Sequence, residues 1–182
     1  MIGDLDSTGG KGLRPQTLER QSQRYERVMA WADEGSLVTT DDYLFAALTL
    51  TTSDHPRHLL RAQELAIQAV ELGEERGFTV QAHATDRLLV IRRERYQLYG
   101  TVIIYEPALK RHQLYPVDPT TTDAIRRSMG VPSLAQLLLE VDALNESEIT
   151  RRLRGEIQDV DLPTGNETPK HSVDEVTRSG DE

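Results

Sequence analysis

Apolar residues recur at helical spacing over the first half of the chain. Between Pro15 and Gly35 they return every three or four residues, separated by Gln, Arg and Glu. Pro15 suits a first helical turn, because the N–H that proline lacks would have no intrahelical partner there. The spacing therefore predicts an amphipathic helix that ends before Gly35.

A second helix is predicted to begin at Thr40, which can cap it. Asp41 and Asp42 follow in the first turn, where their charge is favourable beside the positive end of the helix dipole. The run from Tyr43 to Leu50 is then apolar on nearly every face. We therefore expect this helix to be the most buried element of the fold.

Two further helices are expected before residue 95. Pro56 opens one of them, with Ser53 and Asp54 as candidate caps, and Gly73 ends it. The other begins near Thr79 and carries its apolar residues on one face. No second copy of this helix pair follows at the spacing of about 34 residues that is typical of tetratricopeptide repeats.

The pattern changes after residue 95. Residues 101–105 and 113–117 are rich in β-prone side chains, which predicts a short β-hairpin or extended arm near residues 98–118. A short helix ending at Gly130 and a last helix from Leu134, with a capping box formed by Ser133 and Gln136, complete the body. The predicted fold class is mainly α: a compact helical domain of about five to six helices with helix-turn-helix packing.

Length and charge define the domain organisation. A chain of 182 residues suits one domain with tails. Residues 155–182 hold eight acidic residues against Lys170 and Arg178, and so carry −6 of the net charge of −9. We expect a flexible N-terminal tail over 1–12, a single helical domain over 13–154 and an acidic disordered tail over 155–182, since neither tail has enough apolar surface to fold.

Composition excludes several classes of function. The absence of cysteine removes disulfides and thiolate chemistry, and the net charge of −9 disfavours binding to nucleic acid or to an anionic membrane. No apolar run approaches the length of a membrane helix and no signal peptide is evident, so we expect a cytoplasmic protein. Glycine-rich phosphate loops and the GxSxG motif are also missing, and we predict no cofactor.

Histidines and one arginine are the candidates for chemistry. His55 and His58 lie three residues apart, but no HExxH or similar motif accompanies them, and we predict no metal. Arg87 falls within the apolar stripe of the fourth helix and therefore needs a partner. That partner is either an anionic ligand or a structural carboxylate from Asp41, Asp42 or Asp118, and we favour the structural pair. The catalytic candidates are His83 and Asp86.

Several short motifs resemble a bacterial family of uncharacterised helical domains. They are Asp42-Tyr43, Ala62-Gln63-Glu64-Leu65-Ala66, Asp86-Arg87, Leu98-Tyr99-Gly100-Thr101, Pro116-Val117-Asp118-Pro119 and Gly130-Val131-Pro132-Ser133-Leu134. The hallmark of that family is Tyr-Gly-Thr-Gln after a helix that bears Asp-Arg, and here Val102 stands in place of the Gln. The resemblance implies no activity. It implies that the Asp-Arg pair lies close to the Tyr-Gly-Thr turn.

Two main hypotheses of function remain open, and a metalloprotein is a third, which would require His55, His58 or His83 to meet carboxylates at bonding distance. The first is a noncatalytic helical interaction or accessory protein, which holds a protein partner or a second copy in a groove between its helices and the 98–118 arm. The alternative is a small enzyme or ligand-binding protein with an anion-binding pocket around Arg87, His83 and Tyr99, in which Gly100 and Thr101 also contact the ligand. Convergence of these side chains in a pocket favours the alternative, whereas saturation of their polar groups by each other favours the first hypothesis.

Overall fold

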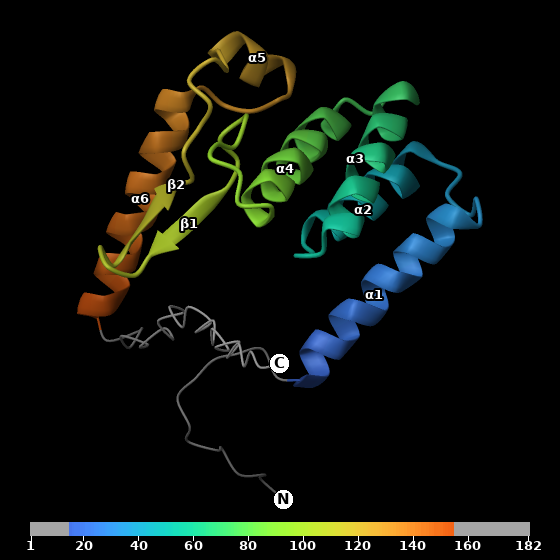
Figure 1. The fold of residues 1–182 in the computed structure, drawn as a ribbon, viewed down its shortest axis with the longest axis horizontal. Helices are drawn as coiled ribbons and strands as arrows, with labels where there is room; N and C mark the ends of the chain where they lie inside the picture. The colour runs from blue at the N-terminus through green and yellow to red at the C-terminus, as the bar shows by residue number, and fades with distance from the viewer. Residues whose placement is uncertain (1–14, 155–182) are drawn as a thin grey trace, which may run out of the picture.

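The computed structural model describes residues 15–154 of the chain, and it is mainly α-helical (Figure 1). The described part consists of α1 (Pro15–Asp33), α2 (Thr40–Thr51), α3 (Pro56–Glu71), α4 (Arg76–Ile91), β1 (Ile103–Glu106), β2 (Arg111–Leu114), α5 (Asp123–Ser128) and α6 (Leu134–Leu153). The predicted fold class, mainly α with about five to six helices and one short hairpin, is confirmed, and this part of the chain has six helices. The predictions for the two tails lie outside the described residues.

Helices α1 to α4 share the larger hydrophobic core. Its members are buried side chains from all four helices: Val28, Met29, Leu44, Ala46, Ala47, Leu50, Ala62, Leu65, Ala66, Ala69, Val80 and Ala84. Many of them are alanines, which let helix backbones approach closely. Helix α3 lies against both α2 and α4, so these three helices form the centre of the fold.

The expectation that α2 would be the most buried element is wrong. Phe45 and Leu48 are 57% and 42% exposed, although both belong to its apolar run. Helix α3 instead has neighbours on two sides, and its buried residues include Leu59 and Leu65. An apolar run is therefore not enough to bury a helix on every face: α2 contacts α1, α3 and α4, yet the side chains of Phe45 and Leu48 stay exposed.

The helix ends also differ from the predicted ones. The cap of α2 is Thr39 rather than Thr40: its side chain accepts a hydrogen bond from the backbone N–H of Asp42, whose carboxylate accepts one from the Thr39 N–H in return. The cap of α3 is His55, whose ring nitrogen accepts from the Arg57 N–H at 3.2 Å. The two predicted caps of α3, Ser53 and Asp54, lie in the preceding loop and have other partners.

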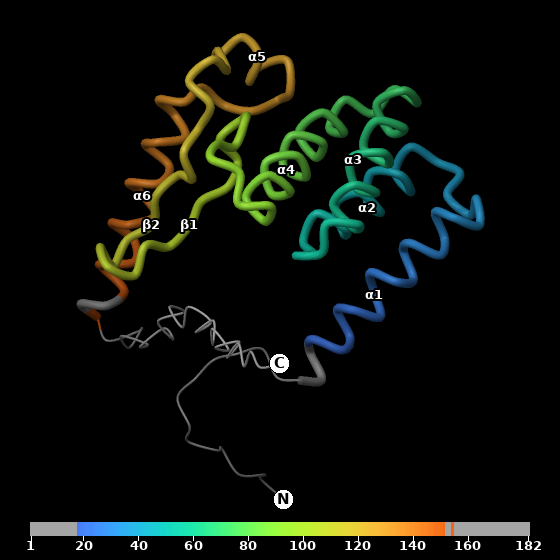
Figure 2. Tube along the Cα trace, viewed as in Figure 1, coloured from blue at the N-terminus to red at the C-terminus, as the bar shows by residue number. Residues whose placement is uncertain are grey.

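A hairpin and α6 form the other end of the molecule, opposite α1 (Figure 2). Strands β1 and β2 are antiparallel, with Ile103 opposite Leu114. Strand β2 packs against α6, where the Asn145 side chain both accepts from the His112 N–H at 2.7 Å and donates to the His112 carbonyl at 2.9 Å. A smaller core of Ala82, Val131 and Leu137 joins this end to α4.

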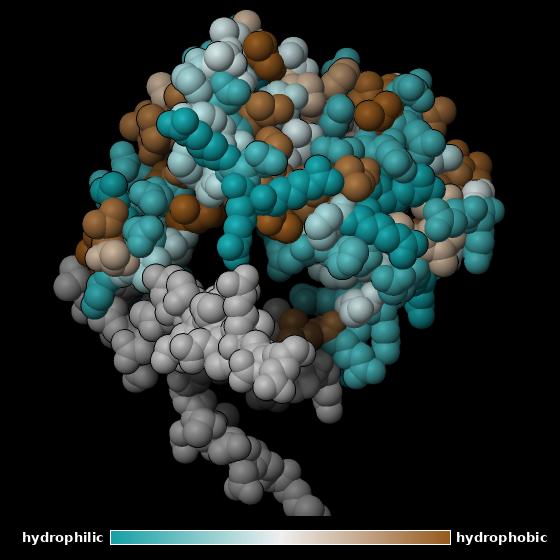
Figure 3. All heavy atoms as spheres, viewed as in Figure 1, coloured by the Kyte–Doolittle hydropathy of each residue, from teal (hydrophilic) through white to brown (hydrophobic). Residues whose placement is uncertain are grey.

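The outer face in Figure 3 carries apolar side chains as separate patches among polar ones. None of the helices in the described part is both long and apolar enough to cross a membrane.

Candidate functional site

A groove of about 460 Å³ lies between α2, α4 and the start of β1. Its walls are Leu48, Thr51 and Thr52 from α2 and the loop after it, Val80, His83 and Arg87 from α4, and Thr101, Val102 and Ile103 from the extended segment. Three predicted site residues, His83, Arg87 and Thr101, therefore meet at one groove. Tyr99, Gly100 and Asp86 are not among the residues that line it.

Asp86 is fully buried behind the groove and holds the turn that follows α4. One carboxylate oxygen accepts from the N–H groups of Leu98 and Tyr99 at 2.7 and 3.0 Å, and the other accepts from the N–H and hydroxyl of Thr101, both at 2.9 Å. The second oxygen also lies 3.1 Å from the Tyr99 N–H. With both oxygens accepting from this turn, the carboxylate is not placed to act as an acid or base for a ligand.

Gly100 gives this turn its shape. Its φ is +91°, a conformation that other L-residues adopt only with strain, and a Cβ there would lie 3.0 Å from Leu137 Cδ1. Tyr99 packs against the smaller core, and its burial raises the pKa of its hydroxyl, with the nearby Asp86 charge adding to the effect. Both residues are therefore structural parts of the turn rather than walls of the groove.

Two buried polar residues that the sequence analysis did not single out hold the same segment. The Gln97 amide group donates to the carbonyls of Val102 and Tyr115 and accepts from the Val102 N–H, at 2.8 to 3.0 Å. Arg126 donates to the Tyr99 carbonyl at 3.1 Å and to the Thr121 carbonyl at 2.8 Å. Neither Gln97 nor Arg126 lies within an apolar stripe of the sequence. The hydrophobic pattern therefore gives no indication that these two polar side chains are buried.

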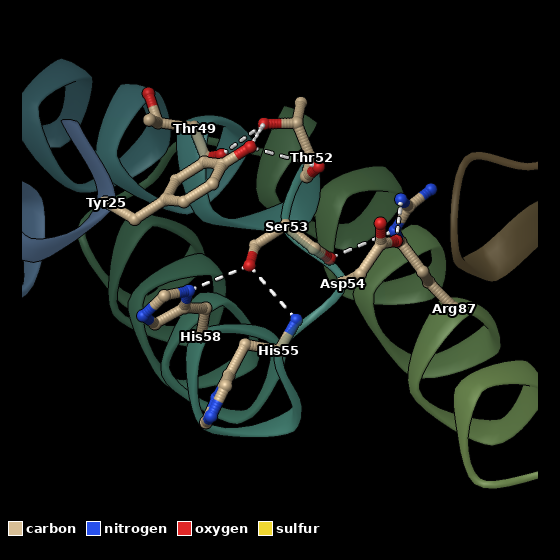
Figure 4. Close-up of polar contacts among 8 residues, drawn as sticks. All are labelled: Tyr25, Thr49, Thr52, Ser53, Asp54, His55, His58 and Arg87. Atoms are coloured by element: carbon tan, nitrogen blue, oxygen red, sulfur yellow. Dashed lines mark hydrogen bonds and ion pairs between the residues drawn. The ribbon is translucent and has the colours of Figure 1, made fainter. Parts of the chain in front are cut away.

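Arg87 makes the structural pair that we favoured, but not with any of the three predicted carboxylates. Its guanidinium donates to the Ser53 carbonyl at 3.1 Å and pairs with the Asp54 carboxylate at 2.5 Å (Figure 4). Asp41 instead pairs with Arg76, Asp42 accepts at the start of α2 and Asp118 accepts from Thr120. The loop between α2 and α3 passes next to α4, a proximity that the spacing of residues does not reveal.

His83 is the most accessible of the candidate groups. Within residues 15–154 no hydrogen bond or ion pair of its side chain is found, and the residue as a whole is exposed, with its partly buried ring at the wall of the groove. Partial burial lowers the pKa of the imidazole, and the negative charge of Asp86 opposes that change. The ring is therefore mainly neutral at pH 7, and one candidate group remains open to a ligand or partner.

A relay of Ser53, His58 and Glu26 connects α1, the loop before α3, and α3. The Ser53 hydroxyl lies 2.8 Å from His58 Nδ1, and His58 Nε2 lies 3.3 Å from a Glu26 oxygen. This order of groups also occurs in serine hydrolases. Ser53, however, is only 4% exposed, and its hydroxyl accepts a hydrogen bond from the His55 N–H (Figure 4). We therefore interpret the relay as a structural link.

The other contacts of this loop are also structural. The Tyr25 hydroxyl lies 3.2 Å from the Thr52 carbonyl and 3.1 Å from its hydroxyl, which ties α1 to the end of α2. The rings of His55 and His58 contact each other in a tilted arrangement, with centroids 5.1 Å apart. Among residues 15–154, no group of three or more histidines and carboxylates has a geometry that could hold a metal ion.

The predicted site residues therefore divide into two sets. Asp86, Tyr99 and Gly100 build the turn, while Arg87, Thr101 and His83 border the groove, with Arg87 and Thr101 already hydrogen-bonded. The groove offers apolar walls and one open imidazole.

Comparison with known proteins adds no family to this picture. The resemblance to helical domains with a Tyr-Gly-Thr-Gln hallmark stays a prediction. No family model matches the chain, and neither a curated protein nor a solved structure matches it.

Proposed function

We propose that the chain is a noncatalytic helical accessory protein that holds an extended segment of a partner protein in the groove between α2, α4 and β1. The lack of a long apolar run or signal peptide in the sequence, together with the resemblance to a bacterial family, leads us to expect this role in the cytoplasm of a bacterium. The observation that carries the proposal is an open groove with apolar walls, at which Arg87 and Thr101 are already hydrogen-bonded and His83 alone of the candidate groups is free. An enzyme would need a second free group beside that imidazole to orient a substrate or to exchange protons with it.

The walls of the groove suit a peptide. Leu48 and Ile103 are each 42% exposed at its edges, and Val80 and Val102 add further apolar surface. Thr51 and Thr52 supply hydroxyls beside them. Such a mixture of exposed aliphatic side chains and scattered polar groups is typical of surfaces that bind protein segments.

Strand β1 supports an extended shape for the bound segment. In the described part of the chain, β1 pairs with β2 alone. The Tyr115 N–H donates to the Val102 carbonyl, so by the alternation of an antiparallel ladder the backbone of Ile103 turns away from β2. An edge strand with outward backbone groups beside a groove is the arrangement to which peptides add as a further strand.

A second candidate function rests on two groove residues. His83 and Arg87 line the same groove, and the Asp54 carboxylate that pairs with Arg87 is itself mostly exposed. A small anionic ligand could take the place of Asp54 on the guanidinium, with His83 beside it. This ligand-binding function would need Arg87 to leave its present partner.

Native mass spectrometry of the protein, purified gently from its own host, distinguishes the two. Under our proposal the wild-type spectrum shows a protein partner, which is lost in Ile103→Lys. The partner is kept in Leu139→Lys, a matched change at an exposed leucine of α6. A bare wild-type chain would contradict the proposal. A retained small molecule that disappears in His83→Ala would support the second candidate instead.

The identified partner then allows a test of strand addition. Ile103→Pro removes the outward N–H without removing a bond to β2, whereas Ile103→Val keeps the N–H and most of the side chain. We expect the proline variant to weaken partner binding at least about tenfold, the effect of one lost backbone hydrogen bond, and the valine variant to bind almost as the wild type does. Equal binding by both would exclude pairing through this strand.

A further inference from the structure

The outer face of α1 carries a row of arginines that ends at a tryptophan. Arg20, Arg24 and Arg27 are exposed and lie one helical turn apart, and Trp31 follows four residues later on the same face. These four residues, with Gln23 and Val28, line a hollow of about 290 Å³. We call this row the α1 arginine face.

A second hollow, of about 190 Å³, adjoins the first at Val28 and Trp31 and continues toward α2. Its walls are mainly apolar, with Leu37, Phe45 and Ala46 among them, and they also include the Asp42 carboxylate, which already accepts from the Val38 and Thr39 N–H groups. Trp31 is 47% exposed at the junction of the two hollows. The combined surface thus offers positive charge along the helix and an apolar socket at its end, which suits a segment that mixes carboxylates with aliphatic side chains.

One carboxylate borders this face: Glu19 precedes Arg20, and its oxygen accepts from the Gln23 amide at 3.4 Å. Two acidic residues of α1 are engaged with α3: Glu26 pairs with His58 and Asp33 with Arg61. No ion pair of Arg20, Arg24 or Arg27 is found within residues 15–154. The net charge of the whole chain is nevertheless −9. The excess of acidic residues therefore lies in segments other than this face.

We propose that residues 155–182 of this chain bind along the α1 arginine face. These 28 residues carry −6 of the net charge, and their acidic residues alternate with aliphatic ones at Asp159-Val160-Asp161-Leu162. An extended chain covers about 3.3 Å per residue, so the segment can span roughly 90 Å, more than the diameter of a domain of this size. Charge and length therefore both fit, and the proposal does not depend on the groove at β1.

The contact is expected to be sensitive to salt. A single exposed pair of arginine and carboxylate contributes little, but a segment attached to the same chain is present at high effective concentration. The screening length falls from about 10 Å at 0.1 M salt to about 3 Å at 1 M, which weakens exposed pairs. Binding of the segment would also cover Trp31, the single tryptophan of the chain.

Acrylamide quenching of Trp31 fluorescence in the full chain tests the proposal, because acrylamide is neutral and salt does not change its own access. We expect the quenching constant of the wild type at low salt to be about half that of a variant whose eight acidic residues in 155–182 are changed to Asn or Gln, since a bound segment would shield part of the exposed ring. In 1 M salt the two constants should coincide. Equal constants at low salt would overturn the proposal.

Charge-matched variants identify the surface. Arg20, Arg24 and Arg27 changed together to Gln should raise the quenching constant as much as neutralising the segment does, and combining both sets of changes should add nothing further. Three other exposed arginines, Arg57, Arg92 and Arg127, changed to Gln serve as the control and should leave the constant unchanged. If the effects of the two sets of changes add, the segment and the face do not meet. If the protection of Trp31 from acrylamide rises with protein concentration, the contact belongs to a second copy, and binding within one chain is overturned.

Discussion

Asp86, Gln97 and Arg126 are buried polar side chains that bind the backbone of one short segment. Asp86 accepts from three of its N–H groups, Gln97 lies across its end and Arg126 donates to its Tyr99 carbonyl. Each supplies partners to backbone groups that have no helix or strand to satisfy them. Polar residues that look catalytic in a sequence can therefore serve entirely to fold an irregular turn.

Replacing Asp86 by Asn should destabilise the fold by about 3 kcal/mol, because the amide NH₂ cannot accept hydrogen bonds and would leave buried N–H groups without a partner. Urea unfolding measures the change in the free energy of unfolding. Asp142→Asn makes the same chemical change at an exposed position of α6 and should alter stability by less than about 0.5 kcal/mol. Similar losses in both variants would contradict the role given to Asp86.

His83 should make stability depend on pH. Its pKa in the folded protein lies below the ordinary value of 6.5, so the folded state binds fewer protons than the unfolded one as the pH falls below that value. Stability is therefore lost from about pH 6.5 downward until the folded-state pKa is passed. His83→Gln should flatten this part of a plot of unfolding free energy against pH, and an unchanged slope would argue against the partial burial of the ring.

The positions of the helices in the bundle depend on close contact between their backbones as well as on the apolar area that they bury. Gly77, in the first turn of α4, is buried against α3: a Cβ there would lie 2.5 Å from the Ala66 carbonyl and 2.7 Å from Val70 Cγ2. A backbone carbonyl cannot rotate away as a side chain can. The distance between α3 and α4 is therefore set by the absence of a side chain at this position.

Gly77→Ala should cost roughly 2 kcal/mol of stability, since overpacking outweighs the gain of about 1 kcal/mol in helix propensity. Thermal unfolding would report it as a lower melting temperature. Gly35→Ala gives a comparison without crowding: nothing lies within 4 Å of its Cβ, and only the strain of φ +71° remains, about 1 kcal/mol. A gain in stability for Gly77→Ala would show that the helices can move apart freely.

Over the whole described chain, two cores of unequal size hold the two ends together. The α1–α4 core has twelve buried residues, whereas the smaller core, formed by Ala82 of α4, Val131 and Leu137 of α6, has three. Helix α6 leaves several large apolar residues exposed, Leu139 and Ile149 among them. The end formed by the hairpin and α6 therefore has fewer buried contacts to hold it closed.

Hydrogen exchange should show this difference directly. We expect amides in the second half of α6 to exchange at least about tenfold faster than those in the middle of α3, because local opening there breaks fewer buried contacts. Mass spectrometry of peptides from the two helices measures both rates in one sample. Equal protection would mean that the two ends open as a single unit.

The fold class was predictable because it depends on patterns close together in the chain. Apolar spacing, Pro56 at a first turn and glycine at the ends of helices indicated the helices, and β-prone runs around Pro107 indicated the hairpin. The ends of the helices were predicted less well, because neighbouring side chains such as Thr39 and His55 compete for the same cap. Small differences in local hydrogen bonding decide which of the neighbouring residues caps the helix.

The amino-acid order was sufficient for a mainly helical domain, for the need of Arg87 for a partner and for a turn at Gly100, since each follows from the chemistry of one residue or its near neighbours. Tertiary packing determines that Asp54 is the partner of Arg87, that Asp86 is buried behind the turn and that Ile103 lies next to α2 and α4. Those choices join residues far apart in the chain. They depend on how the helices pack against each other. The spacing of residues along a single helix does not determine that packing.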